Sequence, residues 1–238
     1  MTAEIGTAIV SYIEPTPGHE RAFNEWYERD HFPAAVLAGP GVFAGARFVA
    51  DAACRTLRPA GATLFGDPAR GRHLAVAWVL PGRQAEWEAW VAAEMETLVA
   101  EERMFPHREH LHTGVYRFVR ATGPVPAPQA LAHGFGGVVA LASPIEVPMP
   151  PPGPCTVVLE AERTIISSAD PPGHELVLAF TEFEPFPAFA AVADAVVTHC
   201  DIDGPGFASP FLATVPGTDI HIEGDRPDRK STRLNSSH

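Results

Sequence analysis

The sequence predicts an α+β fold built from two tandem ferredoxin-like units, each with the element order βαββαβ. Over the first half of the chain, apolar residues alternate as in strands or recur as in helices, in that order. The order returns more weakly in the second half, after a stretch rich in Pro, Ala and Gly. The 238 residues are 46% apolar and 19% charged, which suffices for one large buried core or two small ones.

The first unit is expected over residues 1–120. Its first helix is predicted at 18–39, where an amphipathic pattern ends at Gly39, a common helix stop. A second, longer amphipathic helix is predicted at 83–105. Strands show period-two patterns bounded by Pro or Gly, and they are expected at 7–15, 45–52, 73–81 and 113–120.

A linker is expected at 121–133 and a second unit at 134–220. Five prolines between residues 145 and 154 forbid a helix there, so the second unit is expected to lack its first helix. Its strands are predicted at 134–144, 155–167, 174–183 and 206–216, with one helix at 184–200. The rest, 221–238, is a tail. From residue 228 it resembles translated sequencing adapter, so 228–238 carries no functional argument.

Composition and charge exclude several kinds of partner. The formal net charge is −12 and no Lys/Arg-rich run reverses it, so nucleic acid is not expected to bind. No stretch reaches the roughly 20 consecutive apolar residues of a membrane span, and the N-terminus has no basic n-region. No membrane partner is expected, and a cytoplasmic location is predicted. Cys54, Cys155 and Cys200 fit no zinc pattern, so buried free thiols are expected.

The first predicted helix carries seven residues that resemble a known signature: Gly18, His19, Phe23, Trp26, Tyr27, His31 and Pro33. With the following "GPGVFAGARFVA", they are similar to the first helix and second strand of the dimeric α/β-barrel superfamily, nearest to its EthD-like branch. The resemblance covers residues 7–120 well and the second half by element order. It implies two ferredoxin-like sheets that face each other and close an α/β barrel. The duplication suggests that both sheets belong to one chain.

The resemblance implies function only broadly. The superfamily includes cofactor-free monooxygenases, isomerases, decarboxylases and dehydratases of aromatic or polyketide-like compounds, heme enzymes, and members without known activity. The predicted function is a cofactor-independent lyase or isomerase that uses general acid/base chemistry on a small apolar, aromatic or polyketide-like substrate. A heme- or metal-dependent oxidoreductase or monooxygenase and a noncatalytic ligand-binding protein are the alternatives. The sequence leaves pairing into a homodimer open.

Candidate catalytic residues lie along one stripe of the first helix. Phe23, Tyr27 and His31 are each four apart, and Trp26 and Asp30 lie beside them. Imidazole exchanges protons near neutral pH, so His31 is the candidate acid or base. Asp30 is expected to set its tautomer, and Tyr27 to donate to a developing oxyanion. The alternatives are a structural His31 that bonds a carbonyl freed by the following proline, and a Tyr27 hydroxyl that meets solvent.

Substrate contacts are expected from Phe23 and Trp26 and from Arg47 on the second strand. An arginine in an apolar strand has two common roles. It points outward, or it serves inside the barrel as a fixed cation for an anionic substrate group.

His107, His110 and His112 invite a metal site or a heme axial ligand. No carboxylate at a known ligand offset completes such a site, and Arg108 lies among the histidines. We therefore expect an exposed, solvated turn here, with no metal and no cofactor.

Overall fold

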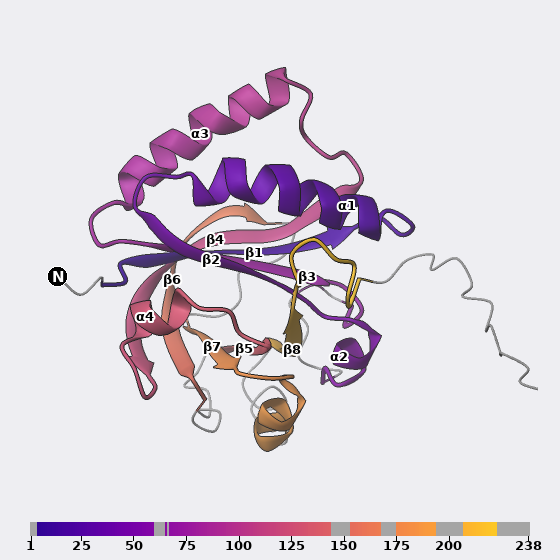
Figure 1. Cartoon of the computed structure of the whole chain (residues 1–238), viewed down its shortest axis with the longest axis vertical. Helices are drawn as coiled ribbons and strands as arrows, with labels where there is room; N and C mark the ends of the chain where they lie inside the picture. The colour runs from indigo at the N-terminus through magenta and orange to yellow at the C-terminus, as the bar shows by residue number, and fades with distance from the viewer. Residues whose placement is uncertain are drawn as a thin grey trace, which may run out of the picture.

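A computed structural model describes residues 4–59, 65, 67–143, 153–167, 175–193 and 207–222. Over these residues, eight antiparallel strands close into a barrel (Figure 1). The strands are β1 (Thr7–Pro15), β2 (Val42–Val49), β3 (His73–Val79), β4 (Arg108–Thr122), β5 (Gly137–Ser143), β6 (Cys155–Ser167), β7 (Glu175–Thr181) and β8 (Phe207–Ala213).

The strand order confirms two ferredoxin-like units within one chain. Around the barrel the order is β1-β3-β2-β8-β5-β7-β6-β4. The first unit therefore contributes β4-β1-β3-β2 and the second contributes β8-β5-β7-β6, so both place their strands in the same relative order. Two seams, β4 with β6 and β2 with β8, join the units. Each sheet thus covers the edges of the other, which leaves no sheet edge along the seams to pair with a second chain.

Six helical segments are defined in full within the described residues: α1 (Glu20–Trp26), η1 (Tyr27–His31), η2 (Pro33–Leu37), α2 (Ala52–Thr56), α3 (Gln84–Ala100) and α4 (Ala127–Leu131). The first three form one continuous rod, and this rod and α3 lie together over the outer face of the first sheet (Figure 1). None of the described helices is long and apolar enough to cross a membrane.

The predicted first helix has the expected length but a different winding. Its second half consists of two π-helical turns, in which the Phe32 N–H donates to the Tyr27 carbonyl and the Ala38 N–H donates to the Pro33 carbonyl at 3.0 Å. Pro33 lacks an N–H, so an α-helix would be interrupted here. The wider π turns carry the rod through the proline, and such turns are frequent at functional sites.

The barrel interior is filled by apolar side chains from both units. Tyr12, Phe48, Trp78, Phe180 and Phe211 are each at most 1% exposed and belong to one core cluster. Alternate residues of the strands point outward, toward the helices. Over the described residues, the interior is therefore a packed core.

The second unit is covered differently from the first. Residues 186–193 are helical, and Phe189 and Val192 pack on the outer face of β5 and β7. Most of the proline-rich stretch predicted to replace a first helix lies outside the described residues. Beyond residue 161, β6 pairs with β4 alone among the described strands, and Ile165 and Ile166 remain 41% and 42% exposed.

The predicted linker is partly a structural element. β4 runs on to Thr122, and α4 buries Ala130 and Leu131 in the barrel core, so residues 121–133 pack on the fold more closely than a free connector would. The boundaries proposed for the two domains stay a prediction. Cys54 and Cys155 are buried free thiols, as expected, while Cys200 and the tail from residue 223 lie outside the described residues.

Candidate active site

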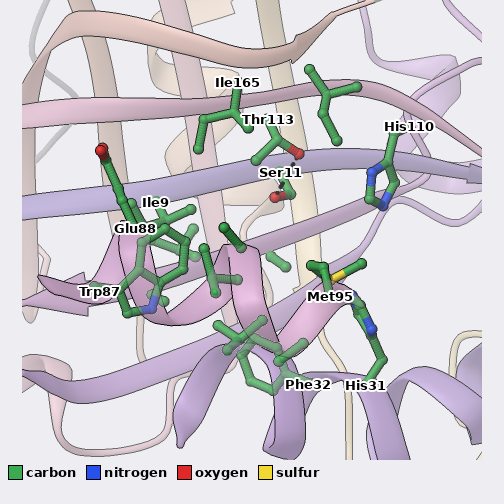
Figure 2. A pocket seen from close by; sticks show the side chains of 18 of the residues that line it. Ile9, Ser11, His31, Phe32, Trp87, Glu88, Met95, His110, Thr113 and Ile165 are labelled. Carbon is green, nitrogen blue, oxygen red and sulfur yellow. Dashed lines mark hydrogen bonds between the residues drawn. The ribbon is translucent and has the colours of Figure 1, made fainter. Parts of the chain in front are cut away.

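A cavity of about 630 Å³ lies between α3 and the outer face of the first sheet. Strands β1, β3 and β4 form its floor, α3 its roof, the η1–η2 rod one wall and β6 of the second unit the opposite wall. Figure 2 shows His31 and His110 at one end and Trp87 and Glu88 at the other. The volume falls within the usual range for small-molecule sites, roughly 300–1,000 Å³.

Small side chains on both sides create this space. Helix α3 is buried only at Trp87 and Leu98, and between these anchors Ala89 and Ala92 line the cavity. The strands beneath contribute residues such as Ala77. The space under this long helix is large enough for a small-molecule ligand.

His31 lies in the wall at the polar end of the cavity. Its side chain is 6% exposed, and its ring stacks on Trp26 with centroids 4.6 Å apart. Its Nδ1 has no hydrogen-bond partner among the described residues. Burial, together with the nearby Arg108 and His110, lowers the pKa of His31 to about 3, so the ring is neutral at pH 7. Among the described residues, no hydrogen bond joins the His31 ring to a carbonyl near Pro33, which was the structural alternative for this residue.

Tyr27 lines the same end of the cavity. It is 4% exposed, and its ring centroid is 5.2 Å from that of His31. The guanidinium carbon of Arg47 lies over the Tyr27 ring, 4.8 Å from its centroid. Burial raises the pKa of Tyr27 to about 12. The phenol therefore stays protonated and can donate a hydrogen bond at any physiological pH. A solvent-facing hydroxyl, the alternative for this residue, does not fit such burial.

Phe23 and Trp26 support the site from behind and do not line the cavity. Phe23 is fully buried and stacks on Tyr27 at 5.4 Å. The Trp26 Nε1 donates to the Arg103 carbonyl at 2.7 Å, and the Trp26 ring lies against His31. Both aromatics fix the rings that do reach the cavity. The expectation that they contact substrate directly finds no support in this geometry.

Asp30 does not have the geometry expected of it. Its carboxylate binds the Arg103 guanidinium, with Nε 3.2 Å from both oxygens, and this ion pair lowers the pKa of Asp30. No hydrogen bond joins it to His31, whose Nδ1 is unpaired. Asp30 therefore ties η1 to the end of α3 and does not set the tautomer of the ring.

Arg47 lies neither in the barrel interior nor in the solvent, contrary to both expectations. It is 8% exposed beneath the η1–η2 rod, where it donates to Asn24 Oδ1 at 2.8 Å and lies 3.9 Å from Glu28. It borders a second cavity of about 500 Å³, between β2 and residues 131–135. Because the Asn24 and Glu28 oxygens already contact the guanidinium, Arg47 links β2 to the rod and is not a free cation for a substrate.

The side chains of the three histidines near residue 110 point to different places. The expectation that all three lie in an exposed, solvated turn is therefore wrong. A β-bulge in β4, where Tyr12 pairs with His112 and Ile13 with His110, sends the two rings to opposite faces. His112 enters the barrel and hydrogen-bonds the Tyr116 hydroxyl at 2.9 Å, whereas His110 lines the cavity. The described residues contain no cluster of three potential metal ligands.

His107, the third member of this group, is exposed. Its ring stacks on His19 with centroids 3.8 Å apart. The three rings therefore occupy three different environments, and they cannot converge on one ligand.

His110 is the site residue that sequence reasoning missed. The cluster of histidines was visible, but the bulge that aims one ring into the cavity has no signature in the sequence. Burial, followed by the charge of Arg108, lowers the pKa of His110 to about 4, so this ring is neutral too. Ser11 and Thr113, hydrogen-bonded to each other at 3.0 Å, supply the polar groups of the floor (Figure 2).

The far end of the cavity joins the two units. Glu88 on α3 forms an ion pair with Arg163 on β6, and both line the cavity. Ile165 and Ile166 of β6 complete this wall. The site is therefore assembled from both halves of the chain, although its titratable rings all come from the first.

Comparison with known proteins supports the fold. No protein-family model and no curated protein matches the sequence. Among solved structures, an anthrone oxidase-like protein superposes with a TM-score of 0.51 at 10% identity, covering 90% of this chain and 94% of the other. The chain has a dimeric α/β-barrel fold. At this identity the likeness shows the fold alone, and the nearer resemblance to the EthD-like branch stays a prediction.

Proposed function

We propose that the protein is a cofactor-independent enzyme, a lyase or isomerase, that moves a proton on an aromatic or polyketide-like compound. The observation that carries the proposal is an apolar cavity with a buried neutral imidazole, His31, and a buried protonated phenol, Tyr27, at one end. The similar anthrone oxidase-like protein is named for an aromatic polycyclic ketone, which agrees with a cavity of this size and character.

The arrangement can divide acid and base roles between the two rings. Neutral His31 accepts a proton from a carbon next to a carbonyl, and Tyr27 donates a hydrogen bond to the oxygen that becomes negative. An imidazole with so low a pKa is a weak base while the cavity is empty. The anion formed in the reaction offsets the positive charge of Arg108, which raises the proton affinity of His31 when it is needed.

Loss of the His31 ring tests the proposal. Once a substrate is found among aromatic and polyketide-like compounds, His31→Ala is expected to lower kcat by roughly 10²- to 10⁴-fold while the protein still folds. The matched control is His107→Ala, which removes an exposed ring just before β4 and outside the cavity. Wild-type turnover per folded molecule in His31→Ala, even with reduced stability, would reject a catalytic role for this residue.

A further inference from the structure

Arg108 is a partly buried cation without a carboxylate partner among the described residues. Its guanidinium stacks over the Trp26 ring at 4.7 Å, and one terminal nitrogen donates to the Phe105 carbonyl. Its Nε is buried without a hydrogen-bond partner. Tyr27 is the one group whose negative charge would act on it appreciably, and Tyr27 is protonated.

This cation lies one side chain behind the polar end of the cavity, because its guanidinium stacks on the Trp26 ring and that ring stacks on His31. The charge of Arg108 acts on three rings that line the cavity, those of Tyr27, His31 and His110. Removing a positive charge from water without a counter-charge costs free energy, and buried charges in folded proteins are normally paired. The missing counter-charge is therefore expected in the molecule that fills the cavity.

We propose that the cavity binds its substrate as a phenolate anion, and that Arg108 is the positioning residue whose charge stabilises it. This inference rests on the proposed function and narrows it, because it restricts the substrate to compounds that also carry an ionisable phenol. The oxygen lies against Tyr27 and the two neutral histidines, and the apolar rings extend under α3. Arg108 acts through the wall and does not have to touch the substrate.

Other charged groups around the cavity leave this end positive. On η1, Asp30 is already paired with Arg103. On α3 and β6, Glu88 and Arg163 neutralise each other at the opposite end. Arg47, whose guanidinium lies over the Tyr27 ring, faces Glu28 at 3.9 Å. With the two cavity histidines neutral, Arg108 is the cation at this end that has no carboxylate partner among the described residues.

The test is the ionisation of a coloured phenol in the cavity, which does not require turnover. Alizarin changes its absorption spectrum when it loses a phenolic proton, so its pKa can be measured free and bound. In wild-type protein we expect the bound pKa to fall by roughly 1 to 3 units, the usual effect of a nearby opposite charge. In Arg108→Met we expect binding of the neutral form to persist and most of the lowering to disappear.

Two further variants serve as a control and as a substitute for Arg108→Met. Arg29→Met removes an exposed arginine of η1 that pairs with Glu25, and we expect it to keep the wild-type shift. Arg108→Gln, which also removes the charge but keeps an amide donor for the Phe105 carbonyl, takes the place of Arg108→Met if that variant does not fold.

Three outcomes would overturn the inference. They are an unchanged or raised pKa of the dye in wild-type protein, an equal lowering in the charge-deletion variant, and no binding of either form by wild-type protein. Success here with no turnover of any compound would instead count against the proposed reaction and leave the anion site standing.

Discussion

Burial keeps three histidines neutral, two at the cavity and one inside the barrel. The pKa of His31 is lowered to about 3 and those of His110 and His112 to about 4, in each case first by desolvation. An unfolded chain would take up these protons near pH 6.5. Between about pH 6.5 and pH 4 the unfolded state therefore binds more protons than the folded state. The free energy of unfolding falls as the pH is lowered through this window.

His31 supplies one of these protons, and its replacement should flatten the pH dependence. At pH 5, His31→Gln is expected to reduce the slope of unfolding free energy against pH by about 1.4 kcal/mol per pH unit, the value for one proton. Urea unfolding of wild type and variant between pH 7.5 and pH 4 measures the slope directly. Equal slopes would mean that the His31 ring takes up its proton in the folded state as readily as in the unfolded chain.

Sequence periodicity predicted which face of the helix carries the rings of the site, but it did not predict the hydrogen-bond partners of the neighbouring charged residues. The four-residue spacing correctly brought Tyr27 and His31 to one sheet-facing stripe, because that spacing follows from helix geometry. The roles predicted for Asp30 and Arg47 were wrong because both side chains bind residues that are distant in the sequence. Their partners, Arg103 and Asn24, lie 73 and 23 residues away in the chain, and no local pattern predicts such contacts.

At the scale of elements, α3 is the roof of the site and has few buried anchors. Trp87 and Leu98 hold its two ends, and the Glu88–Arg163 ion pair ties it to the second unit. The rod opposite gains its π turns beside Pro33, where it carries His31. The position of helix α3 therefore determines the size of the cavity, while the rod supplies His31, the candidate acid or base.

Filling the space under α3 should block binding without weakening the fold. In Ala92→Phe an exposed helix position that lines the cavity gains a ring, so we expect alizarin affinity to fall at least about tenfold through steric overlap, with Tm unchanged. The control is Ala93→Phe, next along the helix, exposed and not part of the lining. Absorption titration of both variants gives the comparison. Equal losses, or none, would place the bound dye elsewhere.

At the scale of the whole molecule, the tandem βαββαβ order predicted the fold because element order survives where sequence similarity does not. The two units repeat one strand order, and each seam joins an edge of one to an edge of the other. The bulge in β4 was not predictable, because it lies in the pairing of β4 with β1 and no local sequence pattern marks it. The strand at 155–167 was predicted at its full length, but its pairing with β4 across a seam was not. These two features aim His110 and complete the wall, so the site is less predictable than the barrel that carries it.

We propose that this protein binds its substrate in the cavity under α3, with His31 in the cavity wall. A crystal structure of the protein with bound alizarin tests it most directly. We expect ring density between α3 and the first sheet, with a dye oxygen within about 3.2 Å of the Tyr27 hydroxyl or a His31 nitrogen. Density in the second cavity beside Arg47, with the space under α3 empty, would contradict it.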